Sequence, residues 1–190
     1  MHETKITEDR VTFGFWVYLM SDCVLFAGLF ATFAVLRGAT FGGPAIDDLV
    51  NMPFVLTETI LLLTSSFTVG LALLAGSAGK KKLTLLALAT TLVLGLAFLG
   101  MELSEFYTLI AEGSGPARSA FLSSFFALVG THGFHILAGS VWMLVLMGYI
   151  AAKGLTEGNI RKLVCLSLFW HFLDIIWIFI FTFVYMFGAI

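Results

Sequence analysis

Long apolar runs alternate with short polar connections along the whole chain. Each run contains at least about 20 residues, which is the length that a helix needs to cross the hydrocarbon core of a membrane. The runs lie at about 13–36, 54–77, 83–110, 120–152 and 163–187. None of the connections between them is long enough to hold a further domain. The pattern therefore predicts an all-α polytopic membrane protein, in which residues 1–190 form a single domain of five transmembrane helices.

Residues that favour helix ends and helix contacts fit this pattern. Pro53 suits the first turn of the second helix, where its missing N–H costs nothing, and Ser119 can cap the fourth helix. Small residues four positions apart let two helix backbones approach closely, so they predict packing surfaces. Two such pairs occur, Ala27 with Ala31 and Ala72 with Gly76.

Composition narrows the class of protein further. Hydrophobic residues make up 59% of the chain and charged residues only 12%, which is typical of polytopic membrane proteins. The ten Lys and Arg residues stand in short clusters between the apolar runs, so the sequence shows no surface for binding nucleic acid. Eight of them lie before the first run or in the second and fourth connections, whereas Arg37 and Arg118 lie in the others. Because cytoplasmic loops are enriched in Lys and Arg, we expect a cytoplasmic N-terminus and a C-terminus on the opposite side.

Ionisable residues lie inside every apolar run. A charged group at the centre of a transmembrane helix costs roughly 2.5–3.5 kcal/mol on insertion scales, so these side chains should face the bundle interior, a cavity or a partner protein. Residues three positions apart share a face of a helix, and three of the runs carry such a pair. The set comprises Asp22 on the first run, Glu58 on the second, Glu102 with Glu105 on the third, His132 with His135 on the fourth, and His171 with Asp174 on the fifth.

The residue types alone leave three interpretations open. Di-iron bundles use Glu-x-x-His pairs, which this sequence lacks, and a haem held by two histidines would need His171 to face His132 or His135. A proton or ion pathway would use carboxylates and histidines, and Asp22 is the best single candidate for it. In a structural role, the pairs would only form hydrogen bonds between helices.

Segments on all five predicted helices form a set of motifs. They are Ser21-Asp22-Cys-Val-Leu-Phe26, Leu63-Thr-Ser-Ser66, Met101-Glu-Leu-Ser-Glu-Phe-Tyr107, Gly130-Thr-His-Gly-Phe-His-Ile-Leu-Ala-Gly-Ser140 and the segment from Phe169 to Tyr185. In content and order these motifs resemble subunit III of the haem-copper respiratory oxidases. Within that family, Phe15-Trp16-Val-Tyr-Leu-Met-Ser-Asp22 and Ser124-Phe-Phe-Ala-Leu-Val-Gly-Thr-His132 are most similar to the bacterial cytochrome bo-type ubiquinol oxidases.

The resemblance implies an accessory subunit that is not catalytic by itself. Haem and copper are expected in the partner subunit I, and no cofactor, metal site or catalytic residue is expected in this chain. The chain is expected to pack on subunit I and the other subunits, to bind membrane phospholipid in a cleft, and to support assembly and sustained proton uptake. The complex would oxidise quinol and reduce oxygen to water in the bacterial inner membrane.

The resemblance also implies roles for the ionisable residues. Asp22 falls where the family keeps a buried carboxylate beside the lipid cleft, so Asp22 and Glu58 are expected to be proton-linked or to line that cleft. The other six are expected to join helices, namely Glu102, Glu105, His132, His135, His171 and Asp174. Two alternatives stay open, an independent ion or proton transporter and subunit III of a cytochrome c oxidase, because five-helix forms also occur among those enzymes.

Overall fold

The computed structural model describes residues 2–43 and 51–186, which form long helices joined by short turns. In chain order the helices are α1 (His2–Leu36), α3 (Met52–Ser77), α4 (Lys81–Ala111), α5 (Ala120–Lys153), α6 (Glu157–Ile180) and the π-helical segment η1 (Phe181–Met186). Each of the five predicted runs is therefore helical, and each helix is long and apolar enough to cross a membrane. The predicted end of the last run, residue 187, lies outside the described residues.

Two helices begin earlier than the apolar runs predicted. α1 starts at His2 and not near residue 13, because no glycine or proline in residues 2–12 stops the helix outside its apolar part. α6 starts at Glu157 and not near residue 163, because the Thr156 hydroxyl caps it by accepting the Asn159 N–H at 3.3 Å. Hydropathy marks where a membrane begins, and the helix continues past that point.

The expected signals at two other helix starts are confirmed. Pro53 lies in the first turn of α3, directly after the extended residue Asn51 and Met52. Ser119 caps α5, and its hydroxyl accepts the Leu122 N–H at 3.1 Å. Both signals are local in sequence, so they could be recognised without knowledge of the tertiary structure.

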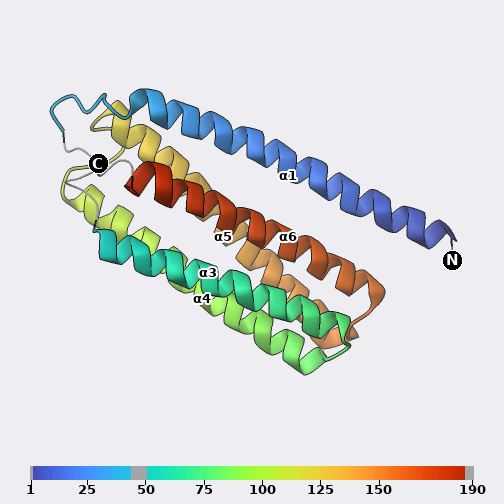
Figure 1. Cartoon of the computed structure of the whole chain (residues 1–190). Coiled ribbons are helices and arrows are strands. Elements are labelled where there is room, and N and C mark those ends of the chain that lie inside the picture. Colours follow the sequence, from blue (N-terminus) through green and yellow to red (C-terminus); the bar gives the residue numbers. More distant parts are fainter. Residues whose placement is uncertain (1, 44–50, 187–190) are drawn as a thin grey trace.

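The helices alternate in direction, and four of them form a bundle (Figure 1). α3 packs on α4, α4 on α5, α5 on α6, and α6 back on α3, while α1 lies along the outside against α5 and α6. The start of α1, the α3–α4 turn and the α5–α6 turn lie at the same end of the molecule, where α1 projects beyond the bundle (Figure 1). These are the segments that carry eight of the ten Lys and Arg residues, so this end is called the basic end below.

The last helix occupies the centre of the fold and the first occupies its edge. In the most apolar part of each helix, 61% of residues are buried for the span Glu157–Met186 and 22% for Arg10–Leu36. Trp170, Trp177 and Tyr185 of the last span are fully buried. This difference leaves the outer face of α1 open to lipid or to a partner protein.

Only one of the two predicted small-residue surfaces packs against another helix of this chain. Ala72 and Gly76 are buried, and a Cβ at Gly76 would meet Leu163 of α6 at 2.8 Å. The prediction for Ala27 and Ala31 is wrong for helix packing within this chain, because both are exposed and line a groove. Small residues on an apolar helix cannot reveal from sequence alone whether a helix or a lipid covers them.

Candidate functional sites

Asp22 lies on the narrow face by which α1 contacts the bundle. Leu19, Asp22, Phe26 and Phe33 are buried at helical spacing, and their neighbours on α1 are mostly exposed. The carboxylate is therefore held between α1 and the bundle, with 8% of the residue exposed. Its position agrees with the expectation that intramembrane carboxylates avoid lipid.

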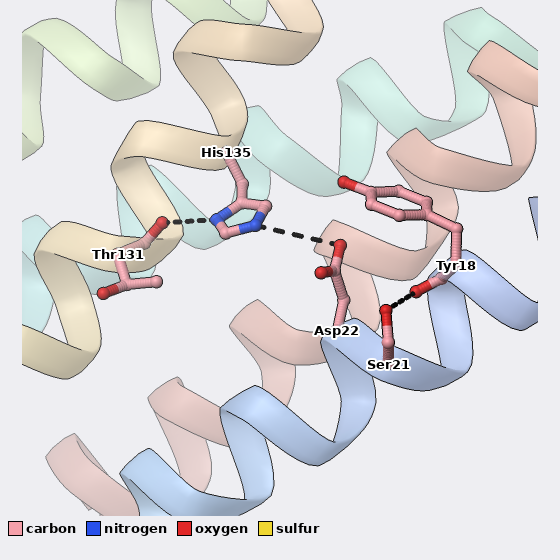
Figure 2. A network of polar contacts seen from close by, with 5 residues as sticks. All are labelled: Tyr18, Ser21, Asp22, Thr131 and His135. Carbon is pink, nitrogen blue, oxygen red and sulfur yellow. Dashed lines mark hydrogen bonds and ion pairs between the residues drawn. The ribbon is translucent and has the colours of Figure 1, made fainter.

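His135 of α5 faces Asp22 across this contact (Figure 2). The His135 Nε2 atom lies 3.8 Å from the Asp22 Oδ2 atom, and the His135 Nδ1 atom lies 2.7 Å from the Thr131 carbonyl oxygen. The Tyr18 hydroxyl interacts with the same carboxylate, and Ser21 donates its hydroxyl to the Tyr18 carbonyl at 2.6 Å. The structure thus brings Asp22 and His135 together, although they belong to different helices and different predicted groups.

Glu58 lies elsewhere, inside the four-helix bundle. It is fully buried, and it interacts electrostatically with Glu105 and Glu102 of α4. Tyr185 of η1 donates its hydroxyl to the Glu105 Oε2 atom at 3.3 Å. Sequence reasoning grouped Glu58 with Asp22, but their nearest polar partners are different.

The carboxylate of Glu102 is packed directly against the backbone of α5. A Cβ built at Gly133 would lie 2.5 Å from Oε1 and 2.7 Å from Oε2 of Glu102. Glu102 is 2% exposed, and its Oε2 atom has no hydrogen-bond partner. Glycine at position 133 is therefore what allows α4 and α5 to approach at this level.

The predicted histidine pair of α5 is divided between two environments. His132 is fully buried, neither ring nitrogen has a hydrogen-bond partner, and its ring packs 5.3 Å from Trp177 and 5.9 Å from Phe98 between centroids. His135 instead turns toward α1. Two side chains three residues apart on a helix point in directions that differ enough for them to contact different neighbours.

His171 and Asp174 lie on the seam between α6 and α3. Ser66 and the His171 Nδ1 atom form a hydrogen bond of 2.7 Å, and Asp174 interacts with both of them. Two buried indole N–H groups bind hydroxyls on the same seam, Trp170 to Ser65 and Trp177 to Thr59, each at 3.0 Å. The structure therefore joins these two helices through side-chain hydrogen bonds.

Several polar residues in these sites, some of them inside the quoted motifs, were not predicted as site residues. Thr59, Ser65 and Ser66 could have been found, because they lie on the face of α3 that carries the buried residues. Tyr18 lies one helical turn before Asp22, which is also a detectable spacing. Tyr185 gave no local signal, since nothing near it in sequence is ionisable.

Two grooves flank the contact between α1 and the bundle. The apolar groove has a volume of about 750 Å³. On one side it is lined by the second half of α1, including Ala31 and Ala34, and by Arg37 just after that helix, and on the other side by Phe179 and Phe183. The basic groove has a volume of about 570 Å³ and contains Tyr18, Trp142, Arg161, Lys162 and Cys165 among its lining residues. Asp22 lies in the chain between the α1 residues that line the two grooves.

Comparison with known proteins gives a consistent result over the whole chain. A family model described as cytochrome c oxidase subunit III matches residues 1–189. A Pseudomonas aeruginosa protein named cytochrome bo(3) ubiquinol oxidase subunit 3 is 59% identical over 181 residues, which cover 95% of this chain and 87% of the relative. The Pseudomonas putida protein of the same name is 54% identical over 93% of this chain and 86% of the relative. A Staphylococcus aureus protein named probable quinol oxidase subunit 3 is 40% identical over 100% of this chain and 98% of the relative.

Proposed function

Because the chain belongs to the cytochrome c oxidase subunit III family, we propose that it is the accessory third subunit of a quinol-oxidising, proton-pumping haem-copper oxidase. The observation that carries the proposal is the 59% identity, across almost the whole chain, to a relative named as a ubiquinol oxidase subunit. Quinol oxidation and oxygen reduction to water then belong to the complex in the bacterial inner membrane. The chain acts as one five-helix domain that packs on subunit I.

The histidines and carboxylates of the chain support placing the redox groups in a partner subunit. Within residues 2–43 and 51–186, no group of three or more His, Cys, Asp or Glu side chains is arranged to hold a metal ion. His132 is enclosed by aromatic rings, and His135 is engaged by Thr131 and Asp22. We assign haem and copper to subunit I, as the family relationship implies, and packing roles to the inter-helix pairs of this chain.

We orient the basic end of the molecule toward the cytoplasm. The start of α1, the α3–α4 turn and the α5–α6 turn lie together at that end and carry most of the Lys and Arg residues. Enrichment of these residues in short cytoplasmic loops supports this direction. The segment η1 then ends on the opposite side of the membrane.

The apolar groove is the surface that we assign to membrane phospholipid. Its volume of about 750 Å³ lies between α1 and the Phe179–Phe183 region, and its lining is apolar apart from Arg37. An acyl chain can fill such a groove without leaving polar groups unsatisfied. A lipid held there would also hold α1 against the bundle.

Purification of a tagged copy in mild detergent tests the proposed function. We expect a large haem-containing partner to co-purify with the chain, and we expect the complex to oxidise quinol and to retain phospholipid. Oxidation of cytochrome c in place of quinol would assign the chain to the other oxidase class. Recovery of the chain alone, with ion transport after reconstitution in vesicles, would contradict a role as an oxidase subunit.

An Asp22→Asn variant is expected to assemble normally and to lose activity several-fold faster than wild type during continuous turnover. The amide keeps the shape of the side chain but cannot carry an exchangeable carboxyl proton. The measurement is oxygen consumption by the purified complex over successive turnovers. Ser21→Ala is the matched control, because it removes an exposed hydroxyl from the same turn of α1. Wild-type durability in Asp22→Asn would show that sustained turnover does not depend on this carboxylate.

A further inference from the structure

The Thr131 carbonyl determines where His135 carries one of its protons. A backbone carbonyl can only accept a hydrogen bond, and it lies 2.7 Å from the His135 Nδ1 atom. Nδ1 must therefore carry a hydrogen and donate it to this carbonyl. The Nε2 atom is then a bare acceptor when the ring is neutral and a second donor when the ring is positively charged.

The Nε2 atom points at Asp22 (Figure 2). Asp22 Oδ2 lies 3.8 Å away and has no hydrogen-bond partner. If neither atom carried a hydrogen, a lone pair on Nε2 would face a negative oxygen, and neither would be satisfied. One hydrogen placed between them removes this conflict, either on Nε2 as an ion pair or on the carboxyl group as a neutral pair.

The surroundings of the pair are mostly aromatic, so water screens the electrostatic interaction between Asp22 and His135 only weakly. The ring of Phe26 lies 5.3 Å from the His135 ring, and the ring of Phe169 on α6 lies 6.5 Å from it. Among titratable groups, Tyr18 of α1 interacts with Asp22, and His132 of α5 interacts with His135. Electrostatic coupling between two groups is stronger in such a setting than at an exposed surface.

We propose that Asp22 and His135 form a dyad that holds one exchangeable proton between them and binds or releases it as a unit. With the proton bound, the dyad has no net charge, whichever of the two atoms carries it. Release of the proton leaves a neutral imidazole facing a carboxylate, and the dyad then carries one negative charge. The inference deepens the proton-linked role of Asp22 and rests on the proposed function only for the use that the complex makes of this proton.

Tyr18 connects the dyad to the basic groove. Its side chain lines that groove, and its hydroxyl interacts with the Asp22 carboxylate. Arg161 and Lys162 line the same groove nearer the basic end. Tyr18 therefore belongs both to the lining of the basic groove and to the immediate surroundings of the Asp22 carboxylate.

Infrared difference spectroscopy of the purified complex, between acid and alkaline samples, tests the dyad. With isotope-labelled histidine and aspartate, the carboxyl band of Asp22 and the ring band of His135 are expected to change together and to account for the uptake of one proton. Asp22→Asn should remove the carboxyl band and His135→Gln should remove the ring band, and in each variant the band of the remaining residue should change over a different pH range, because its partner no longer shares the proton. The double variant lacks both proton-binding groups and should show neither band.

Asp174→Asn is the control, since Asp174 is an intramembrane carboxylate on the α3–α6 seam and should leave both bands unchanged. Bands that titrate separately in the wild-type complex, or single variants in which the remaining band keeps its wild-type pH range, would show two independent groups and overturn the dyad. If a variant fails to assemble, concerted or separate titration of the two labelled bands in the wild-type complex decides the question. A concerted titration with undiminished turnover in Asp22→Asn would keep the dyad and reject only its use in turnover.

Discussion

A Gly95→Ala variant is expected to lose most of the assembled complex, because the added methyl group would overlap the Trp170 ring. An ideal Cβ at Gly95 lies 2.7 Å from Cζ2 and 2.9 Å from Cη2 of that ring. The ring cannot move aside, since it is fully buried, its N–H is bonded to Ser65, and it also meets Gly139 of α5. Overpacking of a core typically costs about 1–3 kcal/mol, and we expect the upper end of this range.

Gly100→Ala is the matched control for this prediction. Gly100 lies on the same helix, and a Cβ added there meets nothing within 4 Å. Because alanine is favoured over glycine inside a helix by about 1 kcal/mol, this control should be neutral or slightly stabilising. Yield and thermal stability of the purified complex measure both effects. Equal stability of the two variants would contradict the packing of Trp170 against Gly95.

A Gly133→Ala variant is expected to separate α4 from α5 at the level of the buried carboxylates. The new Cβ would lie 2.5–2.8 Å from the three carboxylate atoms of Glu102. Glu102 is 2% exposed, so its carboxylate has little room to turn away. We expect a destabilisation of about 1–3 kcal/mol, measured as a lower thermal midpoint and a lower yield of complex.

Two further variants test whether the carboxylate itself causes this loss. Gly148→Ala on α5 adds a methyl group where nothing lies within 4 Å, and it should not destabilise the complex. Glu102→Ala removes the clashing group, so in the double variant Gly133→Ala should cost less than it does alone. In double-mutant cycles, residues in contact usually show coupling energies of about 0.5–3 kcal/mol. A coupling of this size between Gly133→Ala and Glu102→Ala is large enough to measure. If the effects of the two substitutions on stability were strictly additive, the Glu102 carboxylate would not lie against position 133.

The number and approximate positions of the five long apolar helices could be predicted from sequence. Apolar length is a local property, and an isolated segment in lipid must satisfy its own backbone hydrogen bonds by forming a helix. Pro53 and Ser119 are also local signals, and both occupy the predicted places at helix starts. The early starts of α1 and α6 were missed because apolar runs report the membrane boundary and not the end of the helix.

The partners of the polar residues could not be predicted in the same way. Sequence spacing paired His132 with His135. In the structure His135 faces Asp22, and His132 packs against aromatic rings. Glu102 and Glu105 do interact with each other, but they also meet Glu58, which sequence reasoning had grouped with Asp22. Sequence spacing identifies only the neighbours that a residue has on its own helix. The same residue also has neighbours on two or more other helices.

The sequence by itself determined that this chain forms five helices long and apolar enough to cross a membrane, and it determined which ionisable residues lie within those helices. It also carried the motifs that resemble the subunit III family, whose model matches residues 1–189. Only the tertiary structure decided that α1 lies outside a four-helix bundle, that Trp170 fits between Gly95 and Gly139, and that Asp22 meets His135. The physical reason is that each helix is apolar on nearly all sides, so its pattern does not fix its rotation about its own axis. Packing against specific neighbours fixes that rotation, and with it the partner of every buried polar group.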